Sequence, residues 1–262
     1  RQPRYQYAAI LSMCEHSLGR VLDLMDELDI WKDTMLIVNT DHGFLLGEHG
    51  WWAKAAMPFY NELVRIPFFV WDPRSSGCAG ARRQALVQTI DMAPTVLDFF
   101  GIAPPSDMQG RPLAATVAHD SPVREAALFG MHGRHVNITD GRYVYMRAAA
   151  TPDNQPLFDY TLMPLHIWSR FTPANLARAT AVEPLPFSKG SKLWKVPAQN
   201  AFWGDGRQHQ AFGTMLFDLQ VDPGQAEPVR NPQIEEHMCR LLAEQLRANS
   251  APPEQYTRLG LP

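Results

Sequence analysis

Apolar side chains recur at helical spacing near the start of the chain. Between Tyr7 and Leu28 they return at the period that places them on one face of an α-helix. The members of this face are Ala9, Ile10, Met13, Leu18, Val21, Leu22, Met25 and Leu28. The pattern predicts a long amphipathic helix here.

Two short apolar runs follow this helix, "TMLIVNT" at 34–40 and "RIPFFVW" at 65–71. Continuous apolar runs of this length are typical of strands buried on both faces, as in a parallel sheet. A helix followed by such strands favours an α/β architecture. The run from Asp91 to Gly101 predicts a short helix that ends at a glycine.

The pattern changes after Leu113. "AALFGM", "HVNIT", "RYVYMR" and "TMLFDL" predict short strands, and Asp140-Gly141 is a hairpin-turn signal between two of them. We expect long ordered loops over 150–213. "PQIEEHMCRLLAEQLRAN" predicts a helix, and we expect the tail that follows this helix, "SAPPEQYTRLGLP", to be irregular. The chain therefore divides into an α/β domain over 1–113 and a smaller α+β domain over 114–262.

Composition narrows the class of protein. The 262 residues carry a net charge of −3 and no basic stripe, which argues against a nucleic-acid partner. No apolar run reaches the roughly 20 residues of a membrane span. The three cysteines lie far apart and form no C-x-x-C pair, so neither a zinc site nor a disulfide framework is indicated.

The richest group of chemical side chains lies between the two apolar runs, in "NTDHGFLLGEHGWWAK" at 39–54. Asp41 and His42 come directly after a strand, where open α/β sheets bind ligands, and both side chains can bind a divalent cation. Gly43 allows a sharp turn, and Lys54 is suited to face an anionic substrate. The alternative is that Asp41 caps a turn and His42 lies on the surface.

The longer pattern resembles a known family. "TDHGFLLGEHGWWAK", with "WKDTMLIVN" before it and "RIPFFVWDP" after it, resembles the second metal-binding segment of the sulfatases, in the alkaline-phosphatase-like superfamily. "VNITDGRYVYMR" and "MLFDLQVDPGQ" resemble the hairpin and a strand of their C-terminal subdomain. The resemblance implies a mostly parallel sheet sandwiched by helices, followed by a smaller α+β subdomain with an antiparallel sheet.

The resemblance also implies roles for individual residues. Asp41 and His42 would bind the active-site cation, calcium in most sulfatases, with manganese possible in related enzymes. Lys54 would bind a sulfate oxygen and stabilise the charge that develops as the ester bond breaks. His49 would either order the loop or touch the substrate, and His132 in "GMHGRHVN" would contact the leaving group, unless it is a surface histidine.

Two features of the family are missing, a pair of metal-binding Asp residues near the N-terminus and the nucleophile motif. Sulfatases carry C-x-P-x-R or S-x-P-x-R near their N-terminus, where the Cys or Ser becomes the formylglycine nucleophile. Cys78 and Arg82 have that spacing, but the proline is absent and they follow the metal segment instead of preceding it. The resemblance thus implies that the chain is the C-terminal half of an enzyme, that its partner is the missing N-terminal half, and that it is inactive alone.

The expected reaction is hydrolysis of the sulfate ester of a small molecule or glycan. A phosphonate monoester or phosphodiester hydrolase of the same superfamily is the first alternative, because an Asp-His pair and a lysine at this spacing suit that chemistry too. The second alternative is a non-catalytic C-terminal module that binds a ligand or partner.

Overall fold

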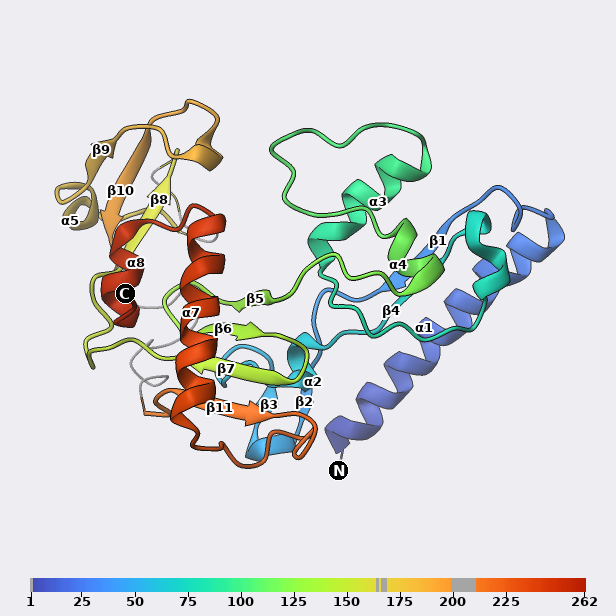
Figure 1. Ribbon diagram of the computed structural model, residues 1–262, viewed down its shortest axis with the longest axis horizontal. Coiled ribbons are helices and arrows are strands. Elements are labelled where there is room, and N and C mark those ends of the chain that lie inside the picture. The colour runs from blue at the N-terminus through green and yellow to red at the C-terminus, as the bar shows by residue number, and fades with distance from the viewer. Residues whose placement is uncertain (1, 164, 166–168, 199–210) are drawn as a thin grey trace. The chain divides into compact units, whose positions relative to one another are not determined.

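The computed structural model describes residues 2–163, 165, 169–198 and 211–262 (Figure 1). The chain forms two compact units. The first unit comprises Arg1–Lys54 and Tyr60–Arg124, and the second comprises Ala55–Phe59 and Glu125–Pro262. No described helix is long and apolar enough to cross a membrane.

The first unit begins with the predicted helix, α1, which spans Gln2–Glu27. Met25 is its only buried residue among those described. Apolar side chains along the helix stay in contact with solvent, and Ile10, Leu11 and Met13 are 61%, 59% and 70% exposed. The predicted helix is therefore confirmed, but the described residues leave most of its apolar face exposed to solvent.

The two apolar runs form β1 (Leu36–Asn39) and β4 (Phe68–Trp71). They pair antiparallel, with Leu36 opposite Trp71, so the expectation of parallel strands is wrong for this pair. The expectation of burial on both faces is also wrong, since Phe69 is 66% exposed. The physical reason is that the chain turns back between them, and the described residues add no third strand to this sheet.

Short elements complete the first unit. The predicted helix after Asp91 is confirmed as α3, and it stops before Gly101, whose φ of 70° suits glycine. The elements are β2 (Leu45–Leu46), η1 (Glu48–Gly50), β3 (Trp52–Ala53), α2 (Asn61–Val64), η2 (Pro73–Cys78), η3 (Thr89–Asp91), α3 (Met92–Phe99) and α4 (Ala114–His119).

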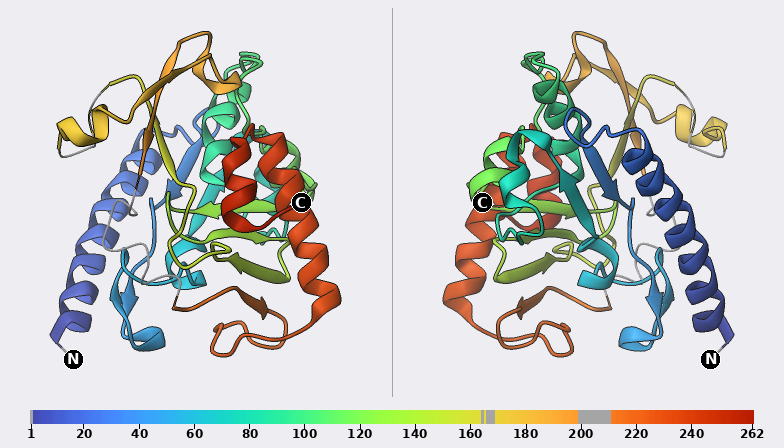
Figure 2. Two further views of the ribbon diagram at one scale, coloured as in Figure 1. Left: turned by 90° about the vertical axis from the view of Figure 1, so that its left-hand side faces the viewer. Right: turned by 90° about the vertical axis from the view of Figure 1, so that its right-hand side faces the viewer.

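The second unit is built on a four-stranded antiparallel sheet of order β11-β7-β6-β5. The predicted turn at Asp140-Gly141 joins β6 to β7, and the Arg142 and Tyr143 amides donate to Asp140 Oδ1. The predicted helix α7 packs on one face of this sheet (Figures 1 and 2). The strands and helix span Ala127–Gly130 (β5), Val136–Thr139 (β6), Tyr143–Arg147 (β7), Met215–Asp218 (β11) and Pro232–Ala248 (α7).

The core of the second unit lies between this sheet and its helices. Ile138, Tyr145 and Leu216 from the strands meet Met238 and Leu242 from α7. Each of these five side chains is at most 2% exposed. Burial on this scale is the main stabilising term, at about 25 cal/mol per Å² of apolar surface.

A second sheet occupies the region expected to be loops. Its order is β8-β10-β9, all antiparallel. Its elements are β8 (Phe158–Thr161), α5 (Pro173–Leu176), β9 (Thr180–Val182), η4 (Pro186–Ser188) and β10 (Leu193–Pro197). The expected irregular tail likewise contains a helix, α8 (Pro253–Leu259), with a proline in its first turn.

Candidate functional site

The loop between β1 and β4 brings three predicted side chains together. Asp41 Oδ2 lies 3.2 Å from His42 Nε2. The Lys54 ammonium contacts the same His42 nitrogen. Asp41 and His42 follow β1 directly, whereas Lys54 returns from the far side of the loop after β3. Lys54 lies twelve positions after His42 and thirteen after Asp41 in the sequence, and the fold brings it next to them.

Both nitrogens of the His42 ring have polar neighbours. Its Nδ1 lies 2.9 Å from the Gly43 carbonyl oxygen, which can only accept a hydrogen bond. Nδ1 can donate to this carbonyl, and Nε2 can then accept from the Lys54 ammonium. An imidazole whose other nitrogen is held by a carbonyl is the usual form of a metal-ligating histidine.

Asp41 is ionised at neutral pH. Desolvation works against its charge, but the His42 amide donates to Oδ1 at 2.9 Å and the Thr40 hydroxyl donates to the same oxygen at 3.3 Å. The pKa of Asp41 is lowered as a result. The Asp41 side chain is 79% exposed and that of His42 37%, so a ligand can reach both from solvent.

Carboxylate and imidazole donors fit a divalent cation, and the residues present supply part of a site. Hard cations such as calcium take six or more oxygen ligands. Among the described residues, no group of three or more His, Cys, Asp or Glu side chains could hold a metal ion. Asp41 and His42 are thus suited to hold a cation together with ligands from elsewhere.

Gly43 is required where the loop passes α2. Its amide donates to the Leu63 carbonyl oxygen at 2.8 Å. A Cβ at this position would lie 1.7 Å from the Glu62 carbonyl oxygen. No side chain fits in that space, so the glycine allows the loop and α2 to pack backbone to backbone.

His49 is held by α2 and its preceding residue. The His49 ring stacks on Tyr60 with a centroid separation of 3.7 Å and an interplanar angle of 9°. Its Nε2 lies 3.3 Å from both carboxylate oxygens of Glu62, and the His49 side chain is 11% exposed. Sequence reasoning named His49 but missed Glu62, since no spacing rule links a loop histidine to a carboxylate thirteen positions later.

Helix α1 fixes the tip of the loop. Arg4 Nε donates to the Leu46 carbonyl oxygen at 2.7 Å, and its guanidinium lies 5.9 Å from the Trp52 ring centroid. The Glu48 carboxylate accepts a hydrogen bond from the Leu46 amide. Desolvation opposes ionisation of Glu48, but hydrogen bonds from its own amide and that of Leu46, with the charges of Arg4 and His49, lower its pKa.

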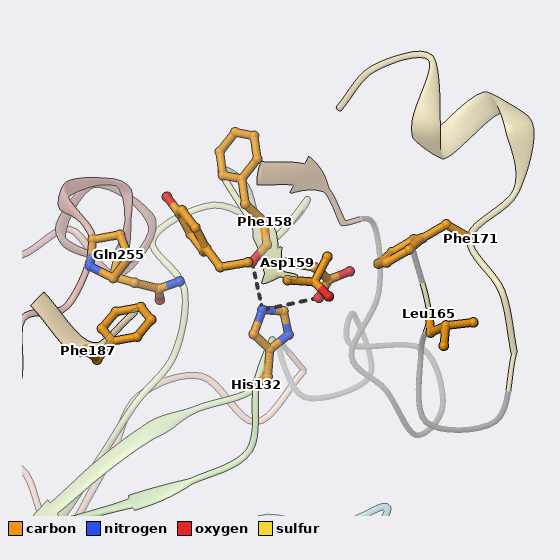
Figure 3. Close-up of a pocket in the computed structure, with 10 residues that line it drawn as sticks. His132, Phe158, Asp159, Leu165, Phe171, Phe187 and Gln255 are labelled. Atoms are coloured by element: carbon orange, nitrogen blue, oxygen red, sulfur yellow. Dashed lines mark hydrogen bonds and ion pairs between the residues drawn. The ribbon is translucent and has the colours of Figure 1, made fainter. Parts of the chain in front are cut away.

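The second unit has a pocket of about 460 Å³ beside His132 (Figure 3). His132 Nε2 lies 2.9 Å from the Phe158 carbonyl oxygen and 3.7 Å from Asp159 Oδ1. The walls are mostly aromatic or apolar, with few polar groups, which is typical of small-molecule sites. The lining residues are His132, Phe158, Asp159, Tyr160, Thr161, Leu165, Phe171, Phe187, Pro252 and Gln255.

Comparison with protein families gives a match over 47–172, to the family described as N-sulphoglucosamine sulphohydrolase, C-terminal. An N-acetylglucosamine-6-O-sulfatase from Bacteroides thetaiotaomicron is 34% identical over 114 residues. That alignment covers 44% of this chain and 20% of the relative. The chain thus spans well under half of the relative that it matches.

Solved structures share the fold. A protein in complex with its substrate D-glucosamine-2-N,6-O-disulfate superposes with a TM-score of 0.60 at 19% identity, over 91% of this chain and 39% of that one. The phosphonate monoester hydrolase of Agrobacterium radiobacter superposes with a TM-score of 0.56 at 19% identity, over 89% of this chain and 38% of that one.

Proposed function

Because the chain belongs to the sulfatase family, of which it represents the C-terminal part, we propose that the whole protein hydrolyses sulfate esters. The observation that carries this proposal is the meeting of Asp41, His42 and Lys54 at the end of β1. A carboxylate, an imidazole lone pair and an ammonium within one loop suit a site that binds a cation and an anion side by side.

Asp41 and His42 are proposed to hold a divalent cation, calcium first and manganese second. When bound, the cation supplies positive charge beside the substrate's sulfate group. Lys54 is proposed to bind a sulfate oxygen of the substrate, in place of its contact with His42 Nε2. Its ammonium would then stabilise the negative charge that grows on the bridging oxygen as the ester bond breaks.

The remaining parts of the site are assigned to an N-terminal half of the same protein. This half would carry the formylglycine nucleophile and the other metal ligands. The exposed apolar side chains of α1, such as Ile10, Leu11 and Met13, support the presence of a further polypeptide segment against this helix. The chain by itself is then expected to be inactive towards sulfate esters.

His132 is proposed to contact the leaving group, which is a small molecule or a glycan. The aromatic walls beside it and the polar side chains of Asp159 and Gln255 suit the apolar faces and hydroxyl groups of such a group. The Phe158 carbonyl orients the imidazole, which remains 43% exposed. His49 is the weaker candidate for substrate binding, because its ring already stacks on Tyr60 and contacts the Glu62 carboxylate.

Two other functions have specific support. The similarity of fold to a phosphonate monoester hydrolase, together with histidine at position 42, favours a phosphonate monoester or phosphodiester hydrolase as the second candidate. A non-catalytic module is favoured by the shortage of metal ligands among the described residues.

The first experiment is peptide mass analysis of the natural protein, followed by turnover of matched aryl sulfate and aryl phosphonate esters. We expect a C-x-P-x-R or S-x-P-x-R peptide that carries formylglycine, and faster turnover of the sulfate. A higher kcat/KM for the phosphonate would favour the second candidate. A protein that consists of this chain alone and turns over neither ester would support the non-catalytic module.

A further inference from the structure

We propose that Glu62 is a positioning residue, which fixes the two arms of the 39–54 loop relative to each other. The inference rests on the proposed function, because it concerns the place of Asp41, His42 and Lys54. Glu62 lies in α2, outside the loop, and it contacts both arms.

The first contact is made by the backbone of α2. The Glu62–Leu63 peptide region lies against Gly43, with the Gly43 amide donating to the Leu63 carbonyl at 2.8 Å. This contact fixes the arm that leaves β1. Asp41 and His42 immediately precede Gly43, so their position depends on it.

The second contact is made by the Glu62 side chain. Its two oxygens lie 3.3 Å from His49 Nε2, while Tyr60 supports the flat face of the same ring. The His49 backbone has a φ of 53°, a left-handed conformation that is unfavourable for a residue with a side chain. Conformations of this kind persist where surrounding contacts enforce them.

The returning arm leads from His49 to Lys54. Between the two arms, the strand pairing of the loop comprises Leu45 with Ala53 and Leu46 with Trp52, and the Gly47 amide donates to the Trp51 carbonyl oxygen at 2.9 Å. Glu62 therefore adds a link from the arm of the proposed metal ligands to the arm of the proposed sulfate-binding lysine. A displacement of about 1 Å between such groups can cost about 100-fold in rate.

The test compares Glu62→Ala and Glu62→Gln in the natural, full-length protein. A glutamine oxygen still accepts a hydrogen bond from His49, so we expect Glu62→Gln to keep kcat within about threefold. Glu62→Ala loses the link, and we expect kcat to fall about 10- to 100-fold with little change in KM. Glu236→Ala, which removes an exposed carboxylate paired with Arg240 at 2.7 Å, is the matched control and should leave kcat unchanged.

Two further measurements separate this inference from the proposed function. Amide hydrogen exchange within 41–54 should quicken in Glu62→Ala and stay at the wild-type rate in Glu62→Gln, whether or not the protein hydrolyses sulfate esters. His49→Ala should resemble Glu62→Ala, and the double variant should add little, because both act through one contact.

The inference is overturned if exchange within 41–54 is unchanged in Glu62→Ala. It is also overturned if Glu62→Gln loses as much kcat as Glu62→Ala, since charge and not position would then be responsible. A wild-type protein without activity on sulfate esters would contradict the proposed function only, and the exchange measurement would still decide the role of Glu62.

Discussion

Gly43 and Glu62 are packed so closely that a methyl group on Gly43 would lie 1.7 Å from the Glu62 carbonyl oxygen. Gly43→Ala must therefore push the loop and α2 apart. We expect the free energy of unfolding to fall by about 1–3 kcal/mol, the usual cost of overpacking, and activity of the whole protein to be lost. Chemical denaturation and ester turnover provide the measurements.

Gly19→Ala is the matched control for this substitution. Gly19 lies within α1, and an added Cβ there would have nothing within 4 Å. Alanine favours the helix over glycine by about 1 kcal/mol, so this variant should be neutral or slightly stabilised. Equal losses in the two variants would contradict the packing argument.

The carboxylate of Asp91 is 0% exposed and paired with the Arg124 guanidinium. Breaking one side of a buried ion pair is expected to cost about 3–5 kcal/mol, so Asp91→Asn should destabilise the first unit by an amount of this order. Asp33→Asn, at an exposed position, should have little effect. Urea denaturation of both variants at neutral pH tests the prediction.

The same carboxylate predicts a dependence on pH. Desolvation opposes ionisation of Asp91, but Arg124 and the amides of Arg111 and Gln88 lower its pKa below that of an unfolded aspartate, about 3.9. Its ionised form therefore stabilises the fold above about pH 4, and this contribution is lost as the pH falls through the lower, folded pKa. The stability difference between wild type and Asp91→Asn should narrow in that acid range. A constant difference down to pH 2 would contradict this assignment.

Lys54→Ala should lower kcat in the whole protein by about 100- to 1,000-fold, the usual loss when a donor to a developing charge is removed. The ammonium acts on the transition state, so KM should change less. Lys32→Ala removes an exposed lysine that pairs with Asp29, and it should leave kcat unchanged. Steady-state kinetics on an aryl sulfate distinguish the two variants.

His42→Ala should weaken binding of the activating cation by about tenfold or more, since even groups that only orient a ligand contribute about that much. The readout is the calcium or manganese concentration that restores half of the activity after treatment with a chelator. His16→Ala, at an exposed position of α1, is the control. Unchanged cation dependence in His42→Ala would remove this residue from the metal site.

Periodic patterns in the sequence predicted much of the fold. The helices α1 and α7 and the β6–β7 hairpin follow from local spacing and from Asp140-Gly141, and each forms where expected. The direction of β1 against β4 could not be predicted, because an apolar run reads alike in parallel and antiparallel sheets. The β8-β10-β9 sheet was not predicted. Its strands are short, and β8 pairs with β10 more than thirty residues later in the sequence, which a local pattern does not reveal.

The candidate site likewise contains residues that the sequence predicts and one that only the folded structure reveals. Asp41, His42 and Lys54 could be selected from their chemistry and their place after an apolar run. Glu62 could not, because its importance arises from contacts with His49 and Gly43 that exist only in the folded loop. Sequence thus points to groups with reactive chemistry more readily than to those that hold them in place.

The uncovered face of α1 bears on how the protein is made. The helix has 26 residues and is roughly 39 Å long at about 1.5 Å per residue. We expect the proposed N-terminal half to cover this face, and because it would precede α1 it would leave the ribosome first. The surface that packs against α1 would then be synthesised before the helix, and this order of synthesis would protect the apolar face of α1 from aggregation.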